Sequence, residues 1–346
     1  MIANQIRTTN KILFILLVVV ALYVLQVLAF IFAPFMFAVF IALVFTPFMR
    51  WFYKRNWPRF LAVITVVLII GLGVFGAVKI IQLSGKEVIE GKGELYRKLD
   101  DKVGQVVAPY AEMLGIELDP SKGIIKEVLQ SDQINDLVLR KIGFGLTSIQ
   151  KGVTMILITF FFLLLLLAGS INFKTVMQET LFKRPTQAIK VFMNIERSIV
   201  RFLLVKFFIS LVTGLLFTII CWSFNISFPI FWGLLTFVLN FIQSIGSIFI
   251  TIFVSMMAVI DIEHPGSMTA AILLFIGVQI LLGSVLEPIL MGKSFSINIV
   301  VVLIMLMFWG FLWGIPGLVL AVPITVLLKI LFEQFPQTQT LARLMS

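Results

Sequence analysis

The chain has 346 residues and a net charge of +10, with 60% hydrophobic and only 13% charged residues and a mean hydropathy of +1.10. Soluble domains average about 25% charged residues, so this composition excludes a water-soluble enzyme and indicates a polytopic protein embedded in a lipid bilayer. The positive charge does not indicate a nucleic-acid partner, because the basic residues lie in short loops between apolar runs instead of along one soluble face.

Three membrane-spanning helices are predicted before the first long hydrophilic segment. Residues 11–32 form an apolar run long enough to span a bilayer, and Pro34 is expected to separate it from a second run at residues 35–49. Residues 50–59 are basic and aromatic, which is typical of a cytoplasmic membrane surface. Residues 60–83 then form the third predicted helix.

The next segment, residues 84–150, is charged and amphipathic. It holds 11 of the 17 acidic residues and repeats apolar side chains at helical spacing, which predicts two or three amphipathic helices. A fourth spanning run follows at residues 153–168, and a second basic loop at 172–201. Because basic loops mark the cytoplasmic side, we expect a cytoplasmic N-terminus and an extracytoplasmic location for residues 84–150.

From residue 202 to residue 332 the chain is almost continuously apolar, apart from five interruptions that are polar or contain glycine and proline. They lie at residues 225–229, 243–247, 261–266, 287–298 and 314–323. The pieces between them are short, which favours broken or re-entrant helices. Membranes tolerate such helices only where the exposed backbone is buried in protein or lines a wet cavity. A transport pathway is therefore expected in the C-terminal half.

The predicted fold class is all-α, a polytopic transmembrane helical bundle with broken or re-entrant helices in the C-terminal half and an amphipathic helical extracytoplasmic insertion. The predicted regions are transmembrane helices 1–3 (1–83), the amphipathic region (84–150), transmembrane helix 4 with the basic cytoplasmic loop (151–201), the C-terminal transport region (202–335) and a cytoplasmic tail (336–346).

Motifs for catalysis are missing from the sequence. Residues 71–76 spell the dinucleotide fingerprint G-x-G-x-x-G, but they sit inside a predicted spanning helix, where close packing between helices explains the glycines better. His264 is the only histidine and Cys221 the only cysteine, so neither a metalloprotease motif nor a disulfide within the chain is present. We expect no enzymatic activity, no resident cofactor and no metal.

The segment around residue 240 carries uncharged polar groups in an apolar environment. Asn240, Gln243 and Ser244 supply amides and a hydroxyl, and Gly246 would let a ligand approach the backbone. Two interpretations stay open. These groups line a substrate pathway, or they make ordinary hydrogen bonds between helices.

Glu287 is the only acidic residue between Glu263 and Glu333. A carboxylate followed by Pro288 at the end of an apolar helix is a candidate site for a cation or a proton. In the alternative interpretation, Glu287 pairs with Lys293 at the water boundary. Gln279, Gly292 and Lys293 belong to the same candidate pathway, and Gln279 precedes Glu287 by about two helical turns.

Asp261 and Glu263 lie beside His264 and form a second candidate for ion coupling. The Pro265-Gly266 dipeptide favours a solvated loop instead. Further along, Gly314, Pro316, Gly317 and Pro323 interrupt an apolar run. They predict a break in the helix, whose free backbone groups would meet water, protein or substrate.

Several of these stretches form a recognisable pattern: Glu287-Pro288, Met291-Gly292-Lys293-Ser294, Phe308-Trp309-Gly310, Trp313-Gly314-Ile315-Pro316-Gly317, Ala321-Val322-Pro323, and Asn240-Phe241-Ile242 with Ile245-Gly246. Together they resemble the AI-2E family of membrane transporters over nearly the whole chain. The chain departs from the family pattern at Gln243, where proline is usual, and at Arg201 and Lys206, where relatives are more neutral.

The resemblance implies a transporter that, in some members, exports the quorum-sensing signal autoinducer-2 and, in others, exchanges sodium or lithium for protons. It also implies a homo-oligomer, with a pentamer as the expected state.

Our leading hypothesis is a secondary transporter of the bacterial inner membrane that exports a small polar solute such as autoinducer-2, with Glu287 as a candidate proton-coupling group. The alternatives are a Na⁺(Li⁺)/H⁺ antiporter and, from a different class, a non-transporting scaffold acting through residues 84–150.

Overall fold

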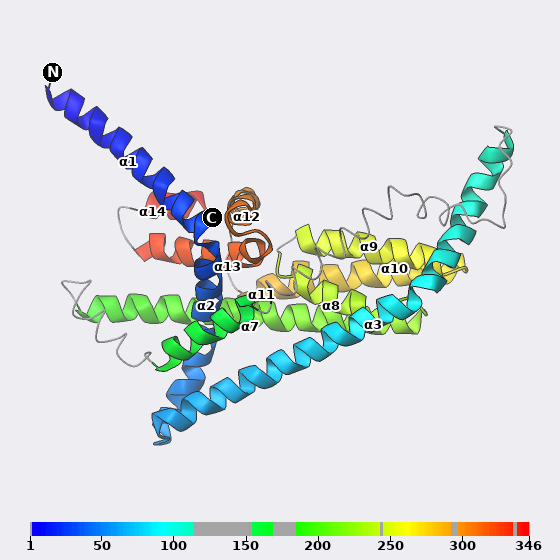
Figure 1. Cartoon of the computed structure of the whole chain (residues 1–346), viewed down its shortest axis with the longest axis horizontal. Helices are drawn as coiled ribbons and strands as arrows, with labels where there is room; N and C mark the ends of the chain where they lie inside the picture. Colours follow the sequence, from blue (N-terminus) through cyan, green and yellow to red (C-terminus); the bar gives the residue numbers. More distant parts are fainter. Residues whose placement is uncertain are drawn as a thin grey trace. The chain divides into compact units, whose positions relative to one another are not determined.

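The computed structural model describes residues 2–113, 152, 154–168, 185–242, 245–291, 297–334 and 338–345. In this part of the chain the regular elements are all helices (Figure 1). They are α1 (Ile2–Val27), α2 (Ala29–Lys54), α3 (Arg59–Met113), an unlabelled helix Thr154–Ala168, α7 (Pro185–Ser223), α8 (Pro229–Leu239), α9 (Ile245–Asp261), α10 (Pro265–Gln279), the π-helix η1 (Ile280–Leu286), α11 (Glu287–Met291), α12 (Ile299–Trp313), α13 (Ile315–Gln334) and α14 (Gln339–Leu344). The all-α prediction is confirmed.

Six helices of the described chain are long and apolar enough to cross a membrane. They are Thr8–Val27, Ala29–Lys54, Phe60–Gly91, Glu196–Ser223, Pro265–Met291 and Ile315–Glu333. Four shorter apolar helices accompany them, at Thr154–Ala168, Pro229–Leu239, Ile245–Asp261 and Ile299–Trp313. Together with the composition, these helices identify a multi-pass membrane protein.

Each of the five interruptions predicted after residue 202 coincides with a helix boundary in the structure. The clearest is Gly314, which lies between α12 and α13 with a φ of +64°. Glycine adopts this left-handed conformation without the steric cost that a Cβ would add. The C-terminal prolines do not all break helices, however, because Pro323 lies inside α13.

The first predicted break was placed at the wrong residue. The chain turns at Leu28, between α1 and α2, and Pro34 lies within α2. Proline inside a helix removes one backbone hydrogen bond, which membrane helices tolerate where neighbouring groups satisfy the freed carbonyl, and α2 accommodates both Pro34 and Pro47. The third helix also continues past Leu83, to Met113, because the amphipathic segment prolongs the same helical pattern.

The glycines at residues 71–76 do not pack against another helix of the described chain. A Cβ built on Gly71, Gly73 or Gly76 would meet nothing within 4 Å. Close packing against other helices of the described residues therefore does not account for this motif.

The chain divides into two compact units, each assembled from separate stretches. Unit 1 comprises Met1–Val67, Val153–Leu204 and Lys293–Ser346, and unit 2 comprises Leu68–Gly152 and Val205–Gly292. Within unit 1, α12 and α13 form a hairpin. A Cβ on Gly317 would collide with the carbonyl of Trp309, and one on Gly310 would lie 2.7 Å from a methyl of Leu318. The hairpin is therefore tightly closed.

Unit 1 also contains two contacts that join distant helices. The indole N–H of Trp313 donates a hydrogen bond to the carbonyl of Leu25, at 3.1 Å. Arg50, at the end of α2, forms an ion pair with the buried carboxylate of Glu196 on α7. The two basic segments predicted from the sequence are thus linked by an acidic residue of the second one.

Within unit 2, α8 and α9 form a second hairpin that packs on α7 and α10. Its apolar core includes Phe217 of α7, Ile250 of α9 and Phe275 of α10, all fully buried. α7 and α8 cross at Gly214 and Gly233, where a Cβ on Gly214 would lie 2.7 Å from the Gly233 carbonyl oxygen. Only glycine permits this close backbone approach.

Candidate functional site

A buried ion pair lies at the junction of α7 and α11 in unit 2. The ammonium of Lys206 donates a hydrogen bond of 2.8 Å to Oε1 of Glu287, and the two side chains are only 4% and 6% exposed. Charges this deeply buried need a partner, because each ion loses its hydration on folding. Glu287 is therefore buried inside the protein with Lys206 as its partner, while Lys293 lies outside the described residues.

A network of uncharged polar side chains lies in the same unit, centred on Asn240 at the end of α8. Nδ2 of Asn240 donates to the hydroxyl of Ser210, at 3.2 Å, and its Oδ1 accepts from the hydroxyl of Ser247, at 2.9 Å. Nε2 of Gln279 reaches the same Oδ1 at 3.5 Å. Four helices thus converge on one amide that is 1% exposed.

The ion pair and the amide network are linked by one face of α7. Lys206, Ser210 and Thr213 lie at positions i, i+4 and i+7, which place them in one row along a helix. All three residues are buried. The hydroxyl of Thr213 donates to the carbonyl of Ile209, so its hydrogen-bonding capacity is partly used within α7. The result is a polar stripe along the part of α7 that follows Arg201 and is otherwise mainly apolar.

Gln279 brings an open hydrogen-bond acceptor into this network. Its Oε1 is buried and has no hydrogen-bond partner among the described residues. A buried acceptor without a partner costs about 1–3 kcal/mol, so this oxygen favours the arrival of a donor from a water molecule or a solute. We therefore regard the surroundings of Asn240 and Gln279 as the candidate site.

The helix that connects Gln279 to Glu287 is irregular. Ile280–Leu286 form a π-helix, and the N–H of Glu287 donates to the carbonyl of Leu282, five residues earlier. π-helical segments are rare and are found frequently at functional sites. The segment alters the helical phase between Gln279 and Glu287, so the two-turn spacing in the sequence does not define their relative direction.

The tip of the α8–α9 hairpin is tightly folded next to Asn240. A Cβ on Gly246 would collide with the carbonyl of Leu239, and the Gly246 N–H donates to the carbonyl of Ile242, at 3.0 Å. Gln243 and Ser244, which were predicted to line the pathway, lie outside the described residues. The hairpin tip thus carries Asn240, Gly246 and Ser247 on a constrained backbone.

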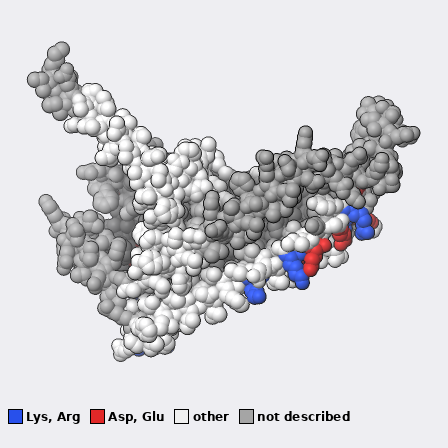
Figure 2. Space-filling model, in the orientation of Figure 1, with Lys and Arg blue, Asp and Glu red and all other residues white. Residues whose placement is uncertain are grey.

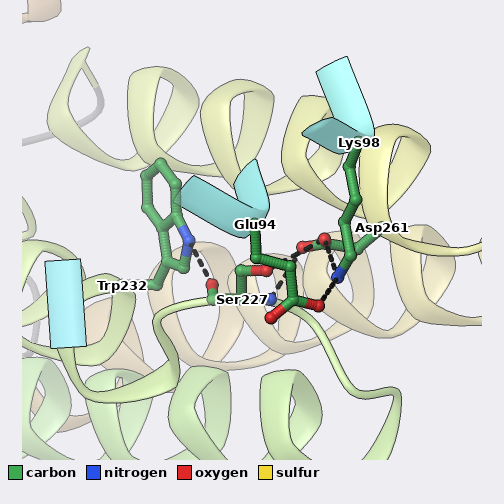
Figure 3. Close-up of polar contacts among 5 residues, drawn as sticks. All are labelled: Glu94, Lys98, Ser227, Trp232 and Asp261. Carbon is green, nitrogen blue, oxygen red and sulfur yellow. Dashed lines mark hydrogen bonds and ion pairs between the residues drawn. The ribbon is translucent and has the colours of Figure 1, made fainter. Parts of the chain in front are cut away.

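Asp261, the last residue of α9, belongs to a separate polar cluster at the open end of the same hairpin (Figure 3). Its carboxylate accepts from the ammonium of Lys98, at 2.9 Å, and from the backbone N–H and hydroxyl of Ser227, at 2.7 and 2.9 Å. The Asp261 side chain is 0% exposed. It joins three segments of the chain in this structure.

Electrostatics favour the charged form of Lys98 in this cluster. Burial lowers the pKa of Lys98, but its contacts with Asp261 and Glu94 raise the pKa more, so the net direction is upward from 10.5. Glu94 lies 3.2 Å from the ammonium. By contrast, Glu263 and His264 are exposed, which agrees with a solvated loop for this part of the predicted ion-coupling cluster.

The structure brings together only some of the predicted pathway residues. Asn240, Gly246, Gln279, Glu287 and the exposed Pro288 belong to unit 2. Gly314, Pro316, Gly317 and Pro323 belong to the α12–α13 hairpin of unit 1. Gly292 and Lys293 lie outside the described residues.

Two members of the polar stripe, Lys206 and Ser210, were not among the predicted site residues. A signal for Lys206 is present in the sequence, since it is a lone basic residue within the apolar stretch of α7. A charge inside a spanning segment by itself suggests a buried partner or a functional role. Ser210 carries no comparable signal, because serine is common in membrane helices.

Comparison with known proteins agrees with the transport-protein interpretation. The AI-2E family transporter model matches residues 12–337 of the chain. The chain is 28% identical over 355 residues to the AI-2 transport protein TqsA of Escherichia coli K12, covering 99% of this chain and 98% of that protein. An inferred transport protein of Haemophilus influenzae is 26% identical, covering 99% and 97%. Another, from Borreliella burgdorferi, is 33% identical over 61% of each chain, less than two thirds of that relative's length.

Proposed function

We propose that this chain, which belongs to the AI-2E transporter family, exports a small polar solute such as autoinducer-2 across the bacterial inner membrane, by way of the buried network around Asn240 and Gln279. Family membership and the relative named as an AI-2 transport protein support this direction. The observation that carries the proposal is the open acceptor of Gln279 beside the buried Asn240 amide. Hydroxyl groups of a dehydrated solute need such partners.

The lengths of the hairpin helices support a location for this network inside the membrane. α8 has 11 residues, so it extends about 16 Å at 1.5 Å per residue, well short of a hydrocarbon core about 30 Å thick. In our proposed topology the N-terminus is cytoplasmic, α7 runs outward, α8 and α9 enter and return as a re-entrant hairpin, and α10 runs back inward. The hairpin tip with Asn240 then lies roughly halfway across the bilayer.

We assign proton coupling to the ion pair of Lys206 and Glu287. Protonation of Glu287 would remove the negative charge and leave the ammonium of Lys206 buried without a counter-ion. A conformation in which Lys206 reaches water or another acceptor would then be favoured. A ligand or proton can shift a conformational equilibrium only through such a difference in stability between two states.

The test of solute transport is efflux from proteoliposomes loaded with autoinducer-2. We expect Asn240→Leu to reduce flux about a hundredfold and Ser247→Ala about tenfold, because each removes a hydrogen bond to the solute site. Thr251→Val is the matched control. Thr251 lies one turn after Ser247 on α9, and its hydroxyl donates to the Ser247 carbonyl and not to the network. No flux in the unmodified protein, or equal flux in all variants, would refute the proposal.

The proton-coupling test uses the same vesicles over a range of pH. Glu287→Gln should abolish the pH dependence of transport, but it also leaves Lys206 buried and unpaired. The double variant Lys206→Met with Glu287→Gln removes both charges and should restore stability without restoring pH dependence. If the double variant keeps the full pH dependence, the ion pair has no role in coupling.

A Na⁺(Li⁺)/H⁺ antiporter is the second candidate, favoured by the buried carboxylate of Glu287. A cation would have to displace the Lys206 ammonium, which lies 2.8 Å from Oε1. Sodium-dependent proton movement in vesicles without any organic solute, together with rescue of a sodium-sensitive strain, would support this candidate over solute export.

We also propose a homo-oligomer, with a pentamer as the expected state. The spanning stretch of α1, Thr8–Val27, has none of its apolar residues buried within the chain, so it is available to neighbouring subunits as well as to lipid. Native mass spectrometry from detergent or nanodiscs measures the subunit number directly, and a monomer would contradict the proposal.

A further inference from the structure

Part of α3 carries a row of residues that faces the open end of the α8–α9 hairpin. We call this end of the hairpin, formed by Ser227, the first turn of α8 and Asp261, the base. Glu87, Gly91, Glu94 and Lys98 follow one another at intervals of four, three and four residues. These intervals place all four on one face of a helix. Lys86 and Glu90 of α3 are exposed and form an i,i+4 pair, and Figure 2 shows basic and acidic side chains along this helix.

The first residue of the row satisfies the start of α8. The carboxylate of Glu87 accepts from the backbone N–H of Ile230, at 3.3 Å, and of Phe231, at 3.1 Å. These N–H groups belong to the first turn of α8, where a helix has no internal acceptors and where its dipole favours a negative charge. Phe228, at the N-cap of α8, supplies no side-chain hydrogen bond, so α3 provides the acceptor instead.

The second residue of the row lets the two segments approach closely. A Cβ on Gly91 would lie 2.6 Å from the ring of Phe228. Phe228 itself has a φ of +62°, a conformation that costs a bulky residue energy unless its surroundings hold it there. The fit of the Phe228 ring against Gly91 provides such a constraint.

The last residue of the row, Lys98, contacts the second helix of the hairpin, α9. Lys98 binds Asp261, the final residue of α9, and Asp261 also holds Ser227 in the connection before α8 (Figure 3). The carbonyl of Ser227 in turn accepts from the indole N–H of Trp232, at 3.0 Å. Both helices of the hairpin are therefore held at the base by α3.

The base and the tip are ends of the same two helices. α8 begins at the Glu87 contact and ends next to Asn240, while α9 begins next to Ser247 and ends at Asp261. We propose that Glu87 and Lys98 are positioning residues, which hold the hairpin base and thereby set the placement of Asn240 and Ser247 at its tip. The importance of that placement for transport rests on the proposed function, but the mechanical link does not.

Hydrogen–deuterium exchange of the full-length protein in lipid nanodiscs tests the mechanical link without any solute. Lys98→Met removes the ammonium from the buried Asp261 carboxylate, and we expect amides at residues 240–242 and 245–247 to exchange about tenfold faster, the effect of losing one charge-assisted hydrogen bond. Lys98→Arg should exchange like the unmodified protein, since it keeps the charge. Lys86→Met is the matched control, because Lys86 lies on the same helix and pairs only with the exposed Glu90 among the described residues.

A milder substitution keeps the test valid if Lys98→Met folds poorly. Asp261→Asn removes the charge opposite Lys98 but keeps an oxygen that can accept from Ser227, and we expect it to speed exchange at the tip in the same direction as Lys98→Met but by less. If Lys98→Met speeds exchange only at Ser227, Ile230 and Phe231 and leaves the tip as in Lys86→Met, the base does not position the tip and the inference is wrong.

Flux measurements on the same variants separate this inference from the proposed function. We expect Lys98→Met to raise the apparent KM for autoinducer-2 more than it lowers the maximal flux, because a displaced tip weakens solute binding first. If the unmodified protein moves no autoinducer-2 while the exchange result holds, the proposed function fails and the positioning role stands. If the unmodified protein transports autoinducer-2 but Lys98→Met leaves amide exchange at the tip unchanged, the positioning role is wrong and the proposed function stands.

Discussion

The ion pair between Lys206 and Glu287 leads to a sharp prediction about stability. The side chains are 4% and 6% exposed and lie 2.8 Å apart, so neither charge can be compensated by bulk water when its partner is removed. Breaking a buried pair on one side typically costs about 3–5 kcal/mol. We expect that loss for Glu287→Gln and for Lys206→Met separately, a large share of the roughly 5–15 kcal/mol that stabilises a typical folded protein.

The double variant should be more stable than either single variant. With both charges gone, no uncompensated ion remains, and replacing a buried pair by neutral side chains is often close to neutral. With a cost of about 3–5 kcal/mol for each single variant and nearly none for the double variant, the coupling energy from the double-mutant cycle should be about 6–10 kcal/mol in magnitude. Equilibrium unfolding of the purified protein in mixed micelles, followed by tryptophan fluorescence, measures all four free energies.

An exposed pair on α3 provides the control for this cycle. Lys86 and Glu90 lie 3.6 Å apart, are 68% and 67% exposed and form an i,i+4 pair. Such pairs contribute about 0.3–0.5 kcal/mol. A cost below about 1 kcal/mol for Glu287→Gln, similar to that of Glu90→Gln, would show that the Lys206–Glu287 pair is hydrated and would refute the description of this site as buried.

Three further predictions concern other parts of the chain. Gly246→Ala should destabilise the protein by about 1–3 kcal/mol in the same unfolding assay, because its Cβ would meet the Leu239 carbonyl, whereas Gly71→Ala has free space and should be neutral or slightly stabilising. Because the pKa of Lys98 is raised in the folded state, its contribution to stability is fully present below the ordinary lysine value of 10.5 and is lost as pH rises through the folded-state pKa. The Lys98→Met effect on unfolding should therefore be constant from about pH 6 to about pH 9 and shrink at higher pH. Replacing residues 103–150 by a Gly/Ser linker of about 20 residues, which spans about 25 Å, should preserve flux, and loss of all flux would favour the scaffold hypothesis.

The last of these experiments depends on how α3 continues beyond the membrane. Because the sequence places residues 84–150 outside the predicted spanning helices, removing all of them would be expected to spare flux in a transporter. The structure shows that Glu87 and Lys98 bind the hairpin base, so removing them would disturb the transport region as well. A deletion that begins after residue 102 keeps these contacts and so separates the two hypotheses more cleanly.

The sequence by itself determined the properties that depend on local chemistry. Apolar length and composition predicted the membrane location and the helical fold, because a backbone in lipid must satisfy its hydrogen bonds within each segment. The same reasoning located five of the helix boundaries after residue 202, since glycine, proline and polar residues act on the chain next to them. It failed at Pro34, because a proline inside a membrane helix need not end the helix where its surroundings satisfy the freed carbonyl.

Only the tertiary structure decided which polar residues meet. Lys206 and Glu287 are 81 residues apart in the chain, and Lys98 and Asp261 are 163 apart. No local pattern encodes such pairings, because they result from the packing of whole helices through apolar contacts and close glycine crossings such as Gly214 with Gly233. The sequence could therefore name Glu287 and Asp261 as unusual carboxylates, while the fold placed one of them beside a buried lysine and made the other part of the hairpin base.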